Sequence, residues 1–160
     1  HERVSIIEVM GRNCGDIALY AGLAGGAEAI LVPEMPYDLD EICKKLISSN
    51  NRGKTQSIIL VAEGVGSATE IGHVIQERTG LEARSTILGH IQRGGTPSAT
   101  DRLLGSRLGG AAVQLLIDGK SSRVVGIKDN DIIDLDIHEA LSMKRQFNLD
   151  MYNLAQILSI

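Results

Sequence analysis

The chain has 160 residues and a net charge of −4, which gives enough length for one domain with a hydrophobic core. The acidic balance argues against a general nucleic-acid-binding protein, so a few placed arginines would have to meet any phosphate ligand. Two cysteines are too few for a disulfide framework and favour the cytoplasm, and no apolar run approaches the roughly 18–20 residues of a membrane span. We find no signal peptide. The chain opens at His1 on the edge of a predicted strand, so we expect it to be part of a larger protein.

Strand and helix patterns alternate along the first half of the chain. The apolar residues from Leu39 to Ile47 follow helical spacing, and the continuous apolar run Ser57–Ala62 is typical of a strand buried on both faces. Ser67 and Glu70 form a possible capping box for a helix that ends near Gly80. The expected elements are strands at 3–9, 29–32, 57–62 and 84–88 and helices at 16–23, 39–47 and 67–80.

The second half opens with the longest expected helix. Thr96 as N-cap and Pro97 at the first helical position predict a helix that runs to about Asp118. Three glycines interrupt it, which we attribute to close packing against a strand. A hairpin follows, and two helices close the chain. These features are the glycines at 105, 109 and 110, hairpin strands at 124–127 and 132–135, and helices around 138–145 and 150–159.

This order of elements predicts an α/β fold, a parallel sheet in a three-layer αβα arrangement of the Rossmann-like kind. In such sheets ligands bind beyond the carboxyl ends of the strands. The segments Met10–Arg12, Glu63 and His90–Arg93 each follow a predicted strand. We therefore expect them to converge on one edge of the sheet.

The loop from Gly89 to Pro97 suits an anion, because glycines allow close backbone approach and a helix N-terminus adds partial positive charge. His90 in this loop could be a general base, an anion contact or a structural histidine, and the neighbouring Arg93 favours the anion contact. Glu63 could accept hydrogen bonds from sugar hydroxyls or cap the helix that follows it. Four arginines in or just after strands favour an anion site over ordinary salt bridges: Arg3, Arg12, Arg84 and Arg93.

A second group of charges lies at the opposite, amino end of the expected sheet. Arg52-Gly53-Lys54 precedes the strand at 57–62 and is either a solvated turn or a second anion site. Gly25 to Glu28, at the end of the first helix, points to the same end. Gly64-Val65-Gly66-Ser67-Ala68-Thr69 matches a dinucleotide fingerprint without its third glycine, which leaves an NAD-binding Rossmann module as an alternative from another class.

Several motifs in order along the chain resemble the C-terminal half of the short bacterial-type 6-phosphofructokinases. They are His1-Glu2-Arg3, Glu8–Arg12, Gly15-Asp16, Val61–Gly64, Leu88–Pro97 and Asp101-Arg102. The resemblance implies transfer of the ATP γ-phosphoryl group to the 1-hydroxyl of fructose 6-phosphate in glycolysis. It implies that Arg12 steadies the transferring charge and that Arg3 and Arg84 reach the 6-phosphate of a neighbouring subunit. The remaining substrate contacts that it implies are Met10, Gly11, Glu63, His90 and Arg93.

The resemblance also implies allosteric regulation in a homotetramer. Its effector site would hold ADP, GDP or phosphoenolpyruvate at Gly26, Glu28, Arg52 and Lys54, with Mg²⁺ at Glu28. Residues 1–91 and 143–160 would form the sugar-phosphate and effector lobe, and 92–142 would pack with the missing ATP-binding lobe. The ATP loops and the catalytic aspartate belong to the N-terminal half, so we expect this chain alone to be inactive. The remaining alternative is a non-catalytic module that binds sugar phosphates or effectors.

Overall fold

In the computed structural model, which describes residues 3–159, the chain divides into two compact units. The first runs to Gly94 and resumes at Phe147, and the second is Gly95–Gln146. His1 and Glu2, which open the first family motif, lie outside the described residues. No helix within 3–159 is both long and apolar enough to cross a bilayer. Binding of sugar phosphate and effector by the first lobe, and packing of the second against an ATP-binding lobe, stay predictions.

A four-stranded parallel sheet forms the centre of the first unit, in the order β2-β3-β1-β4. This confirms the predicted α/β fold with a parallel sheet. Five of the seven residues of β3 are buried, as expected for a strand that is covered on both faces. The strands are β1 (Arg3–Val9), β2 (Ala29–Leu31), β3 (Gln56–Ala62) and β4 (Ala83–Ile87). The helices of this unit are α1 (Asp16–Gly25), α2 (Leu39–Asn51), α3 (Ala68–Thr79) and α6 (Leu149–Leu158).

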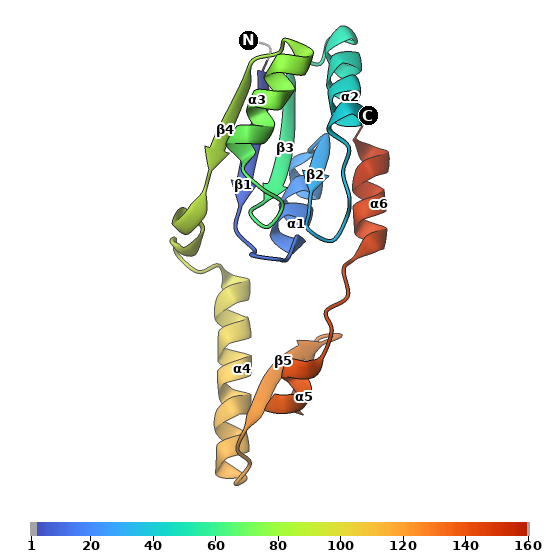
Figure 1. Cartoon of the computed structure of the whole chain (residues 1–160). Helices are drawn as coiled ribbons and strands as arrows, with labels where there is room; N and C mark the ends of the chain where they lie inside the picture. Colours follow the sequence, from blue (N-terminus) through green and yellow to red (C-terminus); the bar gives the residue numbers. More distant parts are fainter. Residues whose placement is uncertain (1–2, 160) are drawn as a thin grey trace. The chain divides into compact units, whose positions relative to one another are not determined.

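Helices cover both faces of this sheet and give the unit three layers. On one face α2 and α3 pack against β1 and β3, with Leu46 and Ile6 among the fully buried side chains. On the other face α1 and α6 pack against the sheet around Leu19 and Leu60. Figure 1 shows α3 lying in front of the sheet. Each such side chain stabilises the fold by about 1.5–3 kcal/mol on burial, so these two clusters fix the strands that carry the site.

Local capping fixes where α3 begins. The Ser67 hydroxyl accepts a hydrogen bond from the Glu70 amide at 3.4 Å, and α3 ends at Gly80 with φ of +72°. The expected reciprocal bond from Glu70 is absent from the described residues, so the capping box at this helix is wrong. Glu8, near the end of β1, supplies a second cap, because its Oε2 accepts from the Ala68 amide at 3.0 Å. The start of α3 is thereby tied to the carboxyl edge of the sheet.

The second unit contains α4 (Ala99–Ile117), a hairpin of β5 (Arg123–Lys128) and β6 (Asp131–Asp136), and α5 (Ile137–Ser142). The predicted hairpin is confirmed, and positive φ values of 51° and 71° at Asp129 and Asn130 fit its two-residue turn. The N-cap of α4 is Ser98, so the prediction of Thr96 with Pro97 at the first helical position is wrong. Ser98 is the N-cap because it forms a capping box with Asp101. The Ser98 hydroxyl accepts from the Asp101 amide, and the Asp101 carboxylate accepts from the Ser98 amide.

Within the second unit α4 buries none of its own residues. A Cβ atom added at Gly105, Gly109 or Gly110 would meet nothing within 4 Å, so the expected close packing of these glycines against a strand is wrong for this chain. Apolar side chains on the same helix are also exposed, among them Leu103 at 62% and Leu116 at 68%. The helix thus carries an apolar surface that these residues leave uncovered.

Candidate functional site

The ends of β1 and β3 meet through the carboxylate of Glu63. Its Oε1 accepts hydrogen bonds from the Gly11 amide at 3.0 Å and the Arg12 amide at 2.5 Å. Glu63 follows β3 directly, and Met10 to Arg12 follow β1, which pairs with β3 in parallel. The carboxylate therefore orders the turn that carries Arg12. The alternative that Glu63 caps α3 is wrong, because Ser67 and Glu8 fill that role.

The end of β4 joins the same edge through Gln92. Its Oε1 accepts a hydrogen bond from the Met10 amide at 2.8 Å, across 82 positions in the sequence. Gln92 lies in a short 3₁₀ helix, Gly89–Arg93, that also carries His90 and Arg93. Three of the predicted substrate-binding segments are thus brought together as expected. Sequence reasoning gave Gln92 no role, since a single amide in a loop predicts no particular partner.

One glycine lets two of these loops approach one another, and a second lets the turn after β1 close on itself. A Cβ atom at Gly64 would lie 2.1 Å from the Arg12 carbonyl oxygen, and one at Gly11 would lie 2.3 Å from the Cys14 carbonyl oxygen. Arg12 itself is held at φ of +52°, in the left-handed region that side chains rarely adopt. Gly64 is therefore explained by contact with the Arg12 turn, without the pyrophosphate that the dinucleotide fingerprint would require.

Positive charge surrounds the Glu63 carboxylate. Hydrogen bonds from the backbone of Arg12 and then of Gly11 lower the pKa of Glu63, and the guanidinium groups of Arg12 and Arg93 act in the same direction. Because this pKa is lowered, the contacts persist at neutral pH and are lost only as the pH falls through it. The side chains of His90 and Arg93 are exposed and make no hydrogen bond or ion pair with another described residue. Neither side chain is buried among the described residues, and both are open to a ligand.

Arg3 and Arg84 lie at the other edge of the sheet. Arg3 opens β1, whereas Met10 follows its last residue, so about 20 Å of strand separates them at roughly 3.3 Å per residue. Arg84 pairs with Ser5, also near the amino end. Both guanidinium groups face Glu82, with Arg84 Nε at 2.7 Å and Arg3 NH2 at 3.8 Å from Oε1. The four predicted arginines therefore form two separate pairs, and no single anion can contact both pairs in one chain.

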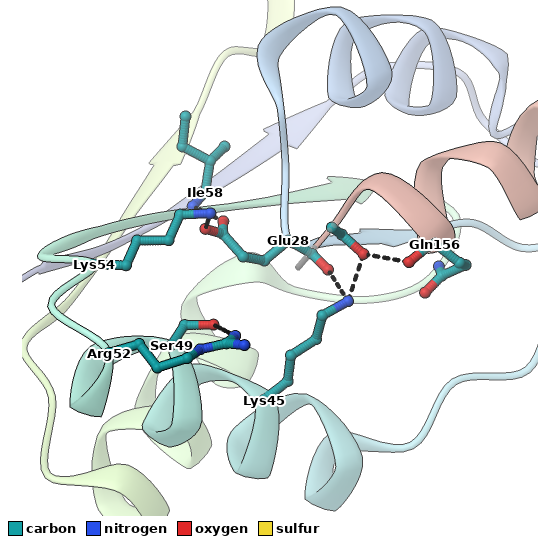
Figure 2. A network of polar contacts seen from close by, with 8 residues as sticks. Glu28, Lys45, Ser49, Arg52, Lys54, Ile58 and Gln156 are labelled. Carbon is teal, nitrogen blue, oxygen red and sulfur yellow. Dashed lines mark hydrogen bonds and ion pairs between the residues drawn. The ribbon is translucent and has the colours of Figure 1, made fainter.

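A second polar cluster surrounds Glu28 at the amino end of β2, as Figure 2 shows. The Glu28 side chain is 2% exposed, its Oε2 accepts from the Ile58 amide at 2.7 Å, and its Oε1 forms an ion pair with Lys54. Lys45, which the sequence did not single out, donates to the Glu28 carbonyl oxygen at 3.2 Å and to the Ser159 hydroxyl. Burial lowers the pKa of Lys45, while the charge of Glu28 opposes this effect.

The other two predicted effector residues lie beside this cluster and do not contact Glu28 through a described hydrogen bond. Arg52 donates from NH2 to the Ser49 hydroxyl at 3.4 Å, and Gly26 ends α1 with φ of +67°. The structure thus unites Glu28 with Lys54, and the loop 52–54 remains largely exposed. An anion near this loop would have to compete with Glu28 for Lys54.

The Mg²⁺ at Glu28 stays a prediction. Within 3–159 no group of three or more His, Cys, Asp or Glu side chains could hold a metal ion. The one buried carboxylate at this place is already engaged by Lys54 and the Ile58 amide. Mg²⁺ is usually held by one or two carboxylates together with phosphate oxygens and water, so at this place Glu28 would have to share its carboxylate between the ion and these two contacts.

Replacing Lys54 by alanine is expected to lower the free energy of unfolding by about 1–3 kcal/mol, because the buried Glu28 would lose the partner that offsets its charge. The value lies below that of a fully buried pair because Lys54 is 40% exposed. Urea unfolding of the chain measures it. Arg52→Ala is the matched control, with an expected change within about 0.5 kcal/mol. If Lys54→Ala lowered the free energy of unfolding no more than Arg52→Ala does, the Glu28–Lys54 pair would add no stability.

Comparison with known proteins relates the chain to one family. The family model described as phosphofructokinase matches residues 1–116. An ATP-dependent 6-phosphofructokinase of Clostridium botulinum (strain Alaska E43) is 61% identical over 99% of this chain and 50% of that protein. One of Alkaliphilus metalliredigens is 59% identical over 100% of this chain and 50% of that protein. The chain spans about half the length of these curated relatives, and the match is to their C-terminal half.

Solved structures that resemble this chain are also phosphofructokinases. The phosphofructokinase of Saccharomyces cerevisiae superposes with a TM-score of 0.82 at 32% identity, over 99% of this chain and 22% of that one. A pyrophosphate-dependent phosphofructokinase of Marinobacter aquaeolei gives 0.78 at 24% identity, over 92% of this chain and 42% of that one, and so shares the fold. The chain has a parallel sheet with three loops joined at its carboxyl edge, and these proteins match nearly the whole length of the chain. This chain is therefore a member of the phosphofructokinase family.

Proposed function

We propose that this chain supplies the sugar-phosphate and effector sites of an ATP-dependent 6-phosphofructokinase whose other half binds ATP. The observation that carries the proposal is the pair of links at the carboxyl edge, from Glu63 to the Arg12 turn and from Gln92 to Met10. They bring the predicted sugar contacts next to the exposed side chains of His90 and Arg93. The names of the curated relatives support the same activity.

In the proposed reaction the 1-hydroxyl oxygen of fructose 6-phosphate forms a bond to the γ-phosphorus of ATP. The bond from that phosphorus to the β–γ bridging oxygen breaks, ADP leaves, and the hydroxyl proton passes to a base. We assign the base, the ATP loops and the Mg²⁺ that accompanies ATP to the other half. From this chain, Met10, Gly11 and Glu63 orient the sugar. His90 and Arg93 bind its 6-phosphate, and Arg12 offsets the charge that develops on the transferring group.

The separation of the arginines supports an oligomeric enzyme. Arg3 lies about 20 Å and Arg84 about 17 Å of strand away from the Glu63 edge, so they would reach the sugar phosphate held by another copy. A closed assembly with such shared sites, which we take to be a homotetramer, would couple them. An ADP, GDP or phosphoenolpyruvate effector at Gly26, Glu28, Arg52 and Lys54 would shift the assembly by its differential affinity for two arrangements. The two free cysteines are compatible with the cytoplasm.

A joined enzyme tests the proposal: this chain fused behind the N-terminal half of the Clostridium botulinum relative. We expect ADP formation that depends on fructose 6-phosphate, and none from the chain alone. The N-terminal half alone is the control. A folded joined enzyme that binds fructose 6-phosphate without turning it over would favour the non-catalytic module. A folded joined enzyme that does not bind the sugar phosphate would overturn the proposed substrate.

A further inference from the structure

Glu82 lies immediately before β4 and contacts both arginines of the amino edge. Its Oε1 accepts a hydrogen bond from Arg84 Nε at 2.7 Å and lies 3.8 Å from Arg3 NH2. The side chains of Arg3, Glu82 and Arg84 are 34%, 44% and 61% exposed. All three groups are therefore open to a ligand that approaches this edge of the sheet.

The cluster carries more donors and more positive charge than Glu82 can satisfy. Two guanidinium groups share one carboxylate oxygen, which leaves one net positive charge. Each guanidinium has five N–H donors, and the Nε of Arg3 is buried without a hydrogen-bond partner among the described residues. A phosphate dianion has the charge and the acceptor oxygens that this arrangement lacks.

We propose that Glu82 is an internal competitor for phosphate: it holds Arg3 and Arg84 until the phosphate of a sugar phosphate takes them, and so sets the affinity of the site. This rests on the proposed function, in which these arginines complete the substrate site of another copy. A phosphate that pairs side-on with Arg84, through Nε and one terminal nitrogen, would need the Nε donor that Glu82 occupies. Exposed ion pairs are weak, so a ligand can displace the carboxylate reversibly.

The competitor is present across the neutral pH range. The hydrogen bond from Arg84, and then the charges of Arg84 and Arg3, lower the pKa of Glu82. The carboxylate is therefore ionised above that lowered pKa, and protonation does not release the arginines near neutral pH. Only an anion that binds them in its place does so.

The test is Glu82→Gln in the joined enzyme, with Glu77→Gln on α3 as the matched control for loss of one exposed carboxylate. We expect Glu82→Gln to lower the half-saturating concentration of fructose 6-phosphate about two- to fivefold, the range that an exposed ion pair is worth, with kcat unchanged. In an Arg84→Ala background the same substitution should have less effect, since the contact that it removes is already lost. A half-saturating concentration equal to that of Glu77→Gln, or a higher one, would overturn the proposal. Glu82 would then have no effect on the affinity or would orient the arginines for binding.

A second measurement separates this proposal from the proposed function. Inorganic phosphate is titrated into the chain itself, and the Nε–Hε NMR signal of Arg84 reports occupancy. Glu82→Gln should bind phosphate more tightly by a similar factor. Tighter phosphate binding together with an inactive joined enzyme would sink the proposed activity and keep the competitor. Unchanged phosphate binding in Glu82→Gln together with an active joined enzyme would overturn the competitor and keep the proposed activity.

Discussion

Replacing Arg12 by alanine in the joined enzyme is expected to lower kcat about a hundred- to a thousandfold, the loss seen when one group that stabilises transition-state charge is removed. The substitution isolates the guanidinium group. The Arg12 contact with Glu63 is made by the backbone amide, which alanine keeps, and the Arg12 side chain is exposed. Steady-state kinetics measure kcat and KM separately. Asn13→Ala, an exposed neighbour in the same turn, is the control, with little expected change.

The division between kcat and KM decides what Arg12 does. An interaction that is made only in the transition state lowers kcat and kcat/KM equally when it is lost. A rise in KM at constant kcat would instead place Arg12 among the groups that bind the sugar phosphate before reaction. Arg12→Lys keeps the charge without the planar fork, so we expect it to recover part of the loss.

Replacing Gly64 by alanine is expected to lower the free energy of unfolding by about 3 kcal/mol, the upper part of the usual range for overpacking. The added Cβ would lie 2.1 Å from the Arg12 carbonyl oxygen, and a backbone atom cannot rotate away as a side chain does. The loops that follow β1 and β3 would have to separate, which would strain the hydrogen bonds from Gly11 and Arg12 to Glu63. Urea unfolding of the chain measures the change.

Gly94→Ala is the matched control for this prediction. Its Cβ would meet the Ile91 carbonyl oxygen at an ordinary 3.6 Å, and its φ of −92° is open to any residue. We expect a change within about 0.5 kcal/mol. Should Gly64→Ala cost no more than this control, the close approach of the two loops would have no energetic role.

The sheet and the meeting of the three loops could be predicted because periodicity and strand direction determine them. The alternation of elements requires parallel strands, and parallel strands place Glu63, Met10 and Gln92 at one edge whatever their detailed contacts. The opposite position of Arg3 has the same origin, since it opens the strand that Met10 follows.

Other features depend on contacts that no local pattern encodes. The bond from Met10 to Gln92 spans 82 positions, and the sequence between them gives no sign of it. The start of α4 at Ser98 rather than Thr96 depended on which hydroxyl could exchange two hydrogen bonds with Asp101. The glycines of α4 meet open space, so nothing within 3–159 accounts for their small size.

The position of Arg3 and Arg84 at one edge and of His90 and Arg93 at the other also has a consequence for dilution. Under the proposed function an isolated copy would retain its fold, because its core is internal to the first unit, yet it would hold only part of each phosphate site. Affinity for the sugar phosphate would then belong to the assembly and rise with the enzyme's own concentration. A cell could change its flux through this step by changing how much of the protein is assembled, with no effector present.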